Sequence, residues 1–317
     1  MTVLVLTDTG DLAADLIVLE LQRRAIRYRR LNIDDFPAHL QIVYDPVDSS
    51  AIFFARGEQF NSADVGAAWY RRSRQFTYQD PYIQHEISVF LQCLWQEMTW
   101  PWVNDPIAVD KANSKLWQLR IASEIGFDIP DTLVGNQRSR VAGRFTPGPF
   151  IAKTLGGAAI ERYGKRYDLF SQLIPLSELE EAAVEAAPCI FQESVKPGMD
   201  VRVTVVGEHV FATDIDAPAG YADWRAAPRE AINYCPVDLP TEVVKRCREL
   251  CRTAGLSYGA FDFVRQPGDR YVFLEVNPSG QWGWIEHATG QRITEAIVDV
   301  LVGHQGGPDA RRPRIQS

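Results

Sequence analysis

Cysteine is scarce in this sequence, and its spacing does not indicate a disulfide framework. The five cysteines are an odd number, whereas small disulfide-rich domains carry an even set at short intervals. Cys247 and Cys251 lie four residues apart in a helix-like stretch and could share a metal ion, but no histidine or second cysteine pair adjoins them. The sequence therefore favours the alternative, reduced cysteines in a cytoplasmic protein.

Segments that target a protein or anchor it in a membrane are also absent. The opening residues MTVLVLTD have no basic start and too short an apolar run for a signal peptide. No apolar stretch approaches the roughly 20 residues that a membrane helix needs. An excess of positive charge is missing as well, because the net charge is −8. Neither nucleic acid nor an anionic membrane is therefore expected as a partner.

The length and composition are those of an ordinary globular protein. At roughly 100–200 residues per domain, 317 residues predict two or three domains. Apolar residues make up 46% and charged residues 23% of the chain, which is typical of a folded protein with a substantial core.

The first 36 residues predict a strand, a helix and a second strand. Residues 2–8 are a short, β-branched apolar run. Residues 11–26 have helical periodicity, with an apolar face at Leu12, Leu16, Leu19 and Ile26. This α/β opening resembles a nucleotide-binding fold. No G-x-G-x-x-G follows the first strand, however, so a dinucleotide site of the Rossmann type is not expected.

Three arginines, Arg71, Arg72 and Arg74, fall within four residues and allow two interpretations. They are either a solvated turn or an anion contact between domains, since arginine pairs bidentately with carboxylate and phosphate. Residues 82–98 follow as an amphipathic helix, with an apolar face at Ile83, Ile87, Phe90, Leu91, Leu94 and Met98. Two prolines after it mark a domain boundary near residue 105.

The rest of the chain alternates strands with two capped helices. A helix from Asn113 or Ser114 ends at Gly126, and another ends at Gly255. The predicted strands are 149–154, 189–195, a hairpin over 200–215 that turns at Gly207-Glu208, and a second hairpin over 259–277 that turns at Pro267-Gly268. Residues 303–317 have no apolar pattern and are predicted to be a disordered tail.

Six polar residues interrupt the apolar strands of this second part. Burying a charge without a partner is costly, so each needs an opposing group or an ion. A hard cation held by carboxylate and amide oxygens, bridging to the phosphates of a nucleotide, would satisfy all of them. These residues are Lys153, Glu193, Arg202, Asp262, Glu275 and Asn277.

Asp262, Glu275 and Asn277 are the predicted metal ligands. Asp262 is central in one strand of the second hairpin and Glu275 is central in the other, so antiparallel pairing can bring the two carboxylates together. Glu275 and Asn277 are two residues apart and share a strand face. Each residue alone could be an ordinary polar group at a hairpin end. The three together favour magnesium, which accepts such ligands and takes further oxygens from phosphates.

The order of these motifs resembles that of the ATP-grasp ligases, from about residue 105 to 300. The resemblance implies an ATP-grasp fold, in which two α+β subdomains clasp ATP, with two magnesium ions. It also assigns residues: two lysines that reach the phosphates, a strand that contacts the adenine and three metal ligands. These are Lys115 and Lys153, then Gln192, Glu193 and Val195, then Asp262, Glu275 and Asn277.

A narrower resemblance, to the microviridin-type ligases that form graspetides, rests on AWYRRSRQF, GMDVRVTVVG and the DWR segment at 223–225. It implies a pre-ATP-grasp domain over 1–105, then subdomains over 106–190 and 191–302. Asp200, Arg202 and Arg225 would lie at the acyl-transfer site, although the DWR segment could instead be a packed loop anchor. Gly156 and Gly157 would close over phosphates, or form a plain turn.

The activity that this resemblance implies is ligation within a ribosomal precursor peptide. An Asp or Glu side chain would be activated as an acylphosphate and joined to a Ser or Thr hydroxyl or a Lys amine. Such ligases are often homodimers, which no pattern in this chain tests. His209 and His287 are the candidate general bases, although either could be an ordinary surface or packed histidine.

Three other activities share the same nucleotide residues. One is a RimK-like or dipeptide-type ligase that acts on free amino acids or a protein C-terminus. Another is a module that binds ATP without ligation, which the intact lysines and metal ligands argue against. The third is an ATP-grasp kinase acting on a small alcohol, which would release ADP but no phosphate.

Overall fold

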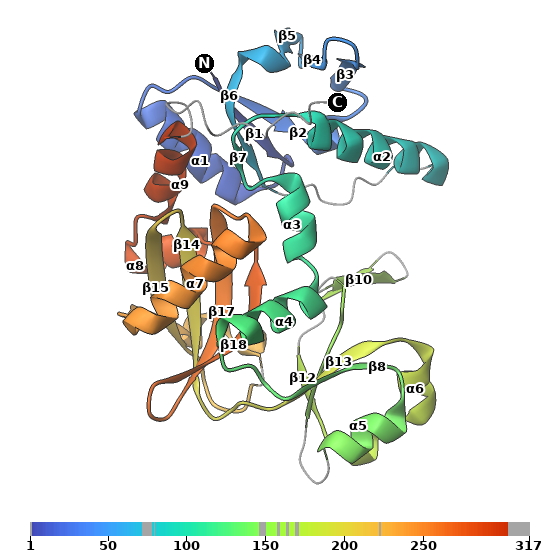
Figure 1. Ribbon diagram of the computed structural model, residues 1–317, viewed down its shortest axis with the longest axis vertical. Coiled ribbons are helices and arrows are strands. Elements are labelled where there is room, and N and C mark those ends of the chain that lie inside the picture. Colours follow the sequence, from blue (N-terminus) through green and yellow to red (C-terminus); the bar gives the residue numbers. More distant parts are fainter. Residues whose placement is uncertain are drawn as a thin grey trace.

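The computed structural model describes residues 2–71, 78, 80–145, 150–156, 159–162, 165–168, 171–221 and 223–303. Within these residues the strands form five sheets, and the chain passes from an N-terminal part through a small central part to a C-terminal part (Figure 1). None of the helices in the described ranges is long and apolar enough to cross a membrane. The overall α/β class agrees with the sequence prediction.

The N-terminal part is built on a parallel sheet in the order β2-β1-β6-β7. Its strands are β1 (Thr2–Thr7), β2 (Tyr28–Asn32), β6 (Val65–Tyr70) and β7 (Trp102–Val103). Val3, Leu4, Val5 and Leu6 of β1 are all buried, as expected for a strand with both faces covered. The predicted strand–helix–strand opening is therefore confirmed.

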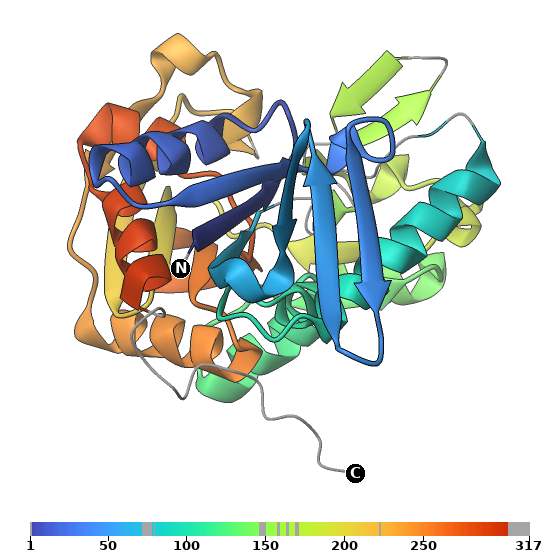
Figure 2. The same cartoon turned by 90° about the horizontal axis from the view of Figure 1, so that it is seen from above.

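Helix α1 (Leu12–Arg23) begins at Asp11, whose carboxylate accepts from the backbone N–H of Ala13. The helix is present as predicted, but two of its four periodic residues do not face the core, because Leu12 is 79% exposed and Leu19 is 60% exposed. Instead Ala13, Ala14, Ile17 and Leu21 are buried. Both sets of residues have helical spacing. The small side chains of the two alanines let the buried face approach its neighbours closely. Helix α9 (Ile293–Gly303), from the far end of the chain, lies beside α1 (Figure 2).

A three-stranded antiparallel sheet and a long helix complete this part. The strands are β3 (Leu40–Asp45), β4 (Ser50–Ala55) and β5 (Glu58–Asn61), and the helix is α2 (Pro81–Glu97). Helix α2 buries Ile87, Leu91 and Leu94 as predicted. Its first turn differs, since Ile83 is exposed. Phe53 and Trp95 stack in the shared core.

Two short helices lead from this part into the next. Helix α3 (Pro106–Ala112) follows β7, and α4 (Lys115–Ile125) follows directly. Ser114 caps α4, and Gly126 ends it in the left-handed region at φ 95°, which glycine adopts without steric cost. Both ends were predicted from the sequence. The cap matters because it places Lys115 at the first turn of the helix.

The central part is a small antiparallel sheet in the order β12-β9-β13-β8. Its strands are β8 (Thr132–Gly135), β9 (Phe150–Lys153), β12 (Gln172–Ile174) and β13 (Cys189–Glu193). Helices α5 (Arg138–Phe145) and α6 (Glu181–Ala186) pack on it, and β10 (Ala159–Arg162) pairs with β11 (Lys165–Asp168) as a separate hairpin. The central part has a separate hydrophobic core, in which Phe150 contacts both Phe145 and Phe191.

The C-terminal part is an antiparallel sheet in the order β16-β15-β14-β17-β18. Its strands are β14 (Met199–Val206), β15 (His209–Asp216), β16 (Asn233–Pro236), β17 (Tyr258–Gln266) and β18 (Arg270–Asn277). Helix α7 (Thr241–Ala254) packs against this sheet, and α8 (Gly283–Thr289) leads into α9. The two predicted hairpins, β14–β15 and β17–β18, are confirmed with their turns.

Cys247 and Cys251 lie on the buried face of α7, within the apolar core. Burial raises the pKa of Cys251 to about 12, which favours the protonated thiol over the thiolate that ligates metals. Among the described residues no cluster of three or more His, Cys, Asp or Glu side chains could hold a metal ion. The alternative of reduced, unreactive cysteines is the one that the packing supports.

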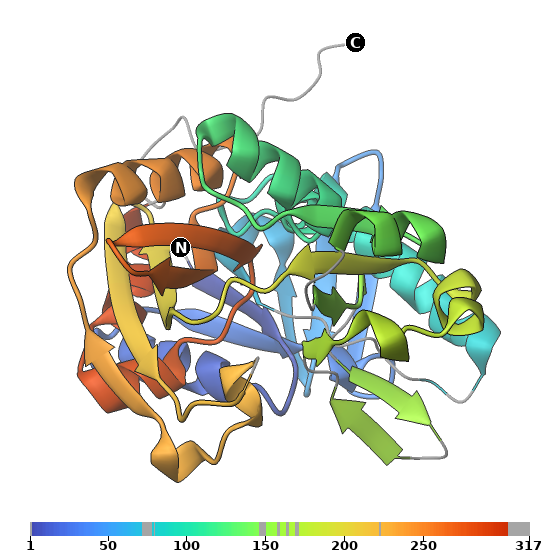
Figure 3. The same ribbon diagram turned by 90° about the horizontal axis from the view of Figure 1, so that it is seen from below.

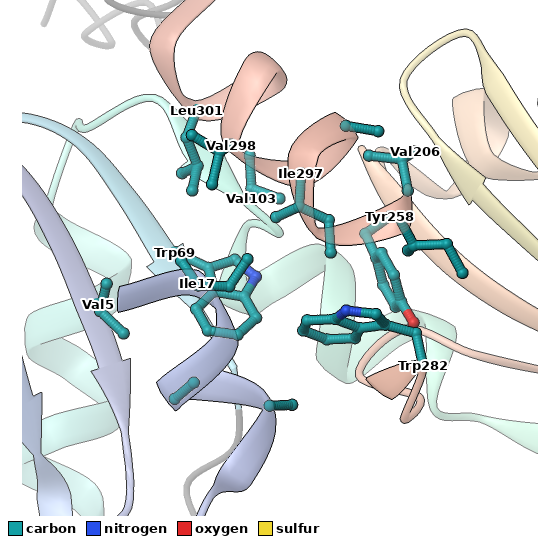
Figure 4. Packing of buried hydrophobic residues seen from close by; sticks show 14 of the residues in the cluster. Val5, Ile17, Trp69, Val103, Val206, Tyr258, Trp282, Ile297, Val298 and Leu301 are labelled. Atoms are coloured by element: carbon teal, nitrogen blue, oxygen red, sulfur yellow. The ribbon is translucent and has the colours of Figure 1, made fainter. Parts of the chain in front are cut away.

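The core between the N-terminal and C-terminal parts is continuous. Trp69 of β6 contacts Trp282 edge to face, and Trp282 in turn contacts Tyr258 of β17. Figure 4 shows these rings together with Ile17 of α1 and Ile297 of α9. Seen from below, the central sheet lies beside the C-terminal sheet (Figure 3). The cleft described next is lined from both.

Candidate active site

Asp262, Glu275 and Asn277 meet on adjacent strands. In the β17–β18 ladder Asp262 lies opposite Glu275, and Ala260 lies opposite Asn277, with an irregularity just after Asp262. The Asn277 amide donates to Asp262 Oδ2 at 3.2 Å and to Glu275 Oε1 at 3.0 Å. The predicted convergence of these three side chains is therefore present in the structure.

Each of the two carboxylates also faces a cation. Arg202 lies opposite Asp262 in the β14–β17 ladder, and its Nε is 2.9 Å from Asp262 Oδ1. Lys115 Nζ, from the first turn of α4, is 2.6 Å from Glu275 Oε2. Gln118, one turn further along α4, exchanges hydrogen bonds with the backbone of Val276. This contact fixes α4 against β18 and so holds Lys115 beside Glu275.

The two acids respond differently to the same burial. Burial raises the pKa of Asp262 to about 6, with Arg202 opposing the shift. Burial also acts to raise the pKa of Glu275, but the charge and hydrogen bond of Lys115, helped by Asn277, outweigh it, so the pKa of Glu275 is lowered. The neighbouring cation therefore decides the direction of each shift, since Lys115 outweighs burial at Glu275 and Arg202 does not outweigh it at Asp262.

Lys153 ends β9 on the opposite wall. Burial lowers the pKa of this lysine, and the positive charge of Lys115 adds to the effect, while Glu275, Asp223 and Asp262 oppose it. Two partly exposed ammonium groups that repel one another across a cleft are expected to bind an anion, because the anion offsets the repulsion. The geometry therefore agrees with the predicted role of Lys115 and Lys153 at phosphates.

A cleft of about 870 Å³ joins these groups. Its walls come from α4, β9 and β13 on one side and from β14, β17 and β18 on the other. This volume lies within the roughly 300–1,000 Å³ usual for ligand pockets. A smaller cavity of about 100 Å³ adjoins it and shares Lys153, Arg202, Asp262 and Glu275 with it.

The predicted adenine-contacting residues line the smaller cavity. Gln192 is buried and donates to Thr132 Oγ1 at 3.0 Å, and Glu193 Oε1 accepts from the Asp131 N–H at 3.1 Å. The Val195 carbonyl accepts from Gln266 at 3.0 Å. The predicted strand therefore does border a cavity. Its polar groups already have protein partners, and Glu193 is exposed at one end.

Arg225 lies on the wall that both cavities share and is held by its own segment. Its guanidinium donates to both oxygens of Asp223, at 2.8 and 2.6 Å. This hydrogen-bonded pair raises the pKa of Arg225. It also keeps the pKa of Asp223 low, although burial acts in the other direction. Asp223 Oδ2 accepts from the Ser171 N–H as well, at 3.4 Å. The DWR segment is thus both a loop anchor and a lining of the cleft.

Asp200 and the glycine loop complete the predicted set. Asp200 pairs with Lys196 at the smaller cavity, where burial raises the pKa of its carboxyl group. Gly156 is exposed and lines the larger cleft. Gly157 lies outside the described residues. His209 and His287 are both exposed, and neither lines either cavity in the described part of the chain.

Two tryptophans in the larger cleft were not predicted as site residues. The ring centroids of Trp224 and Trp284 are 5.3 Å apart, and the Arg202 guanidinium lies 5.7 Å from the centroid of the Trp284 ring. Trp224 belongs to the DWR segment, which the sequence analysis singled out, and Trp284 lies seven residues after Asn277. Aromatic residues are common in cores, so residue type alone did not mark these two.

Arg71 corrects one of the two interpretations of the arginine cluster. It is not solvated, since only 2% of its surface is exposed. Its Nε is 3.2 Å from Asp11 Oδ2, and its Nη1 donates to the carbonyl of Gly280 at 3.0 Å. It therefore links the N-terminal part to the loop after β18. Arg72 and Arg74 lie outside the described residues.

Comparison with known proteins agrees with this architecture. Residues 2–107 match the family described as the MvdD pre-ATP grasp domain. The macrocyclase MdnC of Microcystis aeruginosa, solved with precursor peptide MdnA, is 27% identical with a TM-score of 0.84, and the match covers 96% of this chain and 100% of that one. An ATP-grasp ligase associated with ribosomal peptides in Chryseobacterium gregarium, solved with ADP and leader and core peptides, is 26% identical with a TM-score of 0.86, covering 98% of each chain.

Curated sequences give a shorter match. A probable alpha-L-glutamate ligase of Pseudoalteromonas atlantica is 25% identical over 209 residues, which are 63% of this chain and 66% of that protein. The chain therefore spans slightly less than two thirds of the curated relative. The predicted fold, an ATP-grasp fold preceded by a pre-ATP-grasp domain, is confirmed by the family match and the two solved structures.

Proposed function

We propose that this ATP-grasp ligase uses ATP and Mg²⁺ to join side chains within a ribosomal precursor peptide. A peptide carboxylate is activated as an acylphosphate, and a hydroxyl or amine of the same peptide displaces the phosphate to give an ester or amide ring. The observation that carries the proposal is the cleft in which Lys115, Lys153 and Arg202 face Asp262, Glu275 and Asn277.

The donor set fits magnesium. Two carboxylates and an amide supply oxygen ligands on adjacent strands, and the open cleft leaves room for water and phosphate oxygens, which Mg²⁺ retains in most proteins. Bound there, Mg²⁺ would neutralise charge on the β- and γ-phosphates. We propose two ions, because Asp262, Glu275 and Asn277 offer more oxygen atoms than one ion uses beside a triphosphate.

The remaining cations act on the reacting groups. Lys115 and Lys153 would bind the phosphates, and the small cavity at Gln192, Glu193 and Val195 would take the adenine. Arg225, already rigid in its pair with Asp223, would orient the substrate carboxylate together with Arg202, with Asp200 beside them. A rigid guanidinium loses little entropy when it binds and stabilises the negative charge that grows on the acyl oxygen.

The reaction has two covalent steps. A carboxylate oxygen of the peptide bonds to the γ-phosphorus while the bond from that phosphorus to the β–γ bridging oxygen breaks, which releases ADP. The hydroxyl or amine then bonds to the acyl carbon, the bond between that carbon and the phosphate oxygen breaks, and the nucleophile loses its proton. One water is removed from the peptide for each ring, as ATP becomes ADP and phosphate.

Two comparisons favour a peptide over a free amino acid as the substrate. The solved ligases that carry precursor peptides match nearly the whole chain, including the N-terminal part. The glutamate ligase matches 63% of it. Because the nucleotide residues would serve either substrate, what supports the peptide is the match of residues 2–107 to the MvdD pre-ATP grasp domain, together with the nearly complete match to the two peptide-bound ligases.

The proposal is tested with the double variant Glu275→Gln/Asn277→Ala. Short peptides encoded beside the gene, rich in Thr, Ser, Asp and Glu, are co-expressed with the enzyme and weighed by mass spectrometry. The wild type is expected to remove one water per ring, and the double variant none, because the metal loses the Asn277 ligand and the negative charge of Glu275. Glu242→Gln on the exposed face of α7 is the control and should match the wild type. Full dehydration by the double variant would exclude the metal assignment.

A further inference from the structure

The arginine that follows β6 lies at the carboxyl edge of the N-terminal parallel sheet. The Arg71 N–H donates to the Leu6 carbonyl at 2.9 Å and so extends the pairing of β6 with β1. Its side chain lies 5.1 Å above the ring of Trp282, and its charge is balanced by Asp11, the N-cap residue of α1. Backbone and side chain are therefore both held in place.

From this position the guanidinium reaches the loop that follows the last metal-site strand. Nη1 of Arg71 donates to the carbonyls of Ser279 and Gly280. The Gly280 carbonyl also accepts from the Tyr258 hydroxyl at 2.9 Å. Tyr258 packs beside Trp282 (Figure 4). Two buried donors thus converge on one carbonyl, three residues after Asn277.

The loop that they hold packs tightly against the site. A Cβ added at Gly280 would come within 2.4 Å of the Ala260 Cβ, and within 3.3 Å of both Arg202 Nη1 and the Asn277 Cβ. The Gly280 N–H donates to the Asn277 carbonyl at 3.1 Å. A small shift of this loop would therefore move Asn277 and press on Arg202. Gly280 itself lines the cleft.

We propose that Arg71 is a positioning residue for the magnesium–phosphate end of the cleft. It acts through the Gly280 carbonyl to set the position of Asn277 and Arg202, with Tyr258 as its partner. The inference rests on the proposed nucleotide function but not on the identity of the peptide. It gives the N-terminal part a role in nucleotide binding, although none of the described residues that line the cleft comes from it.

A purely structural role for Arg71 predicts a different outcome. An arginine that only joins the two parts would, when changed, lower stability and weaken all ligands alike. A residue that positions metal ligands affects the metal-dependent part of binding. Mutation of such a residue typically lowers metal affinity by roughly 10–100-fold. The distinguishing quantity is the ratio of the ADP dissociation constants without and with Mg²⁺.

The test measures this ratio by calorimetric titration of ADP into the full chain, in EDTA and in excess Mg²⁺. Arg71→Lys keeps the positive charge, but a single ammonium group cannot reach Asp11 and the two carbonyls at once, as Nε and Nη1 of the guanidinium do. The ratio is therefore expected to fall by about 10-fold or more. Tyr258→Phe removes only the hydroxyl and is expected to lower the ratio by roughly 3-fold, about half that effect on a logarithmic scale. This second variant decides the matter if Arg71→Lys does not fold.

Arg24→Lys is the matched control. Arg24 also joins the two parts, since it pairs with Glu20 of α1 and with Asp299 of α9, but it makes no contact with residues 277–282 in the described structure. Its ratio should equal that of the wild type. An unchanged ratio in Arg71→Lys or, where that variant does not fold, in Tyr258→Phe would overturn the inference, as would equal losses with and without Mg²⁺. If the wild type bound ADP no better with Mg²⁺, the proposed function would fail too.

Discussion

At the scale of single residues, the main feature of the cleft is that its acids already have cationic partners. Asp262 pairs with Arg202, Glu275 with Lys115, and Asp223 with Arg225. Without a partner, the desolvation of each of these buried charges would cost roughly several kcal/mol. The pairs offset these costs, and Lys153 adds a fourth cation to the cleft, so a chain of net charge −8 can still present positive charge to an anionic ligand.

The pair at the DWR segment leads to a prediction for Arg225→Ala. This change removes a guanidinium from the wall near the substrate carboxylate but leaves Lys115 and Lys153 in place. Peptide dehydration is expected to slow by roughly 100-fold, the usual loss for one charge-stabilising donor. The affinity for Mg²⁺ and ADP should change by less than about 3-fold, since the phosphate-binding lysines remain. Initial rates by mass spectrometry and calorimetric titration give the two quantities.

Arg229→Ala is the control for this prediction, because Arg229 is an exposed arginine four residues further along the chain. It should leave both quantities at their wild-type values. A loss of ADP affinity as large as the loss of rate in Arg225→Ala would contradict a role in carboxylate orientation.

At the scale of elements, helix α1 depends on contacts at its C-terminal end. Glu20 accepts from Arg23 at 2.7 Å and pairs with Arg24, and Arg24 extends the network to Asp299 of α9. The hydrogen bond from Arg23 is the largest influence on Glu20, and the network lowers the pKa of Glu20 to about 2. This network helps hold the first helix of the chain against the last.

Glu20→Gln is therefore expected to lower the free energy of unfolding by about 1.5–3 kcal/mol at pH 7, the range for hydrogen bonds to charged groups. Since the folded-state pKa is depressed, the contribution is complete above about pH 4.5 and is lost as the pH falls toward about 2. Urea unfolding at pH 7 and at lower pH should show the difference between variant and wild type shrinking.

Glu124→Gln on α4 provides the comparison. Glu124 pairs with Arg120 in an exposed i,i+4 contact, so its loss should cost less than about 0.5 kcal/mol. A difference for Glu20→Gln that stayed constant between pH 7 and pH 3 would show that its charge does not contribute.

At the scale of the whole molecule, buried polar residues join parts that are far apart in the sequence. The Asn104 side chain donates to the carbonyls of Tyr258 and Pro278, both at 2.8 Å, and accepts from the N–H groups of Ser257 and Tyr258. One amide thus connects the end of the N-terminal part to both strands of the metal-site hairpin. This contact and Arg71 hold the same loop.

Asn104→Ala should be strongly destabilising for this reason. The change removes four hydrogen bonds to the backbone, three of them buried, and we expect a loss of roughly 3–5 kcal/mol in the free energy of unfolding. Urea or thermal unfolding measures it. Asn136→Ala, which removes a single exposed hydrogen bond to the Glu185 carbonyl, should stay within about 0.5 kcal/mol of the wild type. Equal losses of stability in the two variants would contradict the inference that Asn104 joins distant parts of the chain.

Much of the local structure could be predicted from sequence patterns. The cap at Ser114, the left-handed ends at Gly126 and Gly255 and the two C-terminal hairpins follow from local rules. The face of α1 did not, because two stripes on that helix have the same spacing. Which stripe is buried depends on the shape of the sheet and of α9, and these lie outside the helix.

The sequence alone determined which residues could form the site. Charged and amide side chains inside apolar strands need a partner wherever they lie, so Lys153, Arg202, Asp262, Glu275 and Asn277 could be selected before any fold was known. Tertiary structure alone decided how they are paired and what holds them. That Arg71 and Asn104 reach residues 278–280 depends on packing between segments about 170–210 positions apart, and no periodicity or spacing in a sequence encodes a contact over that distance.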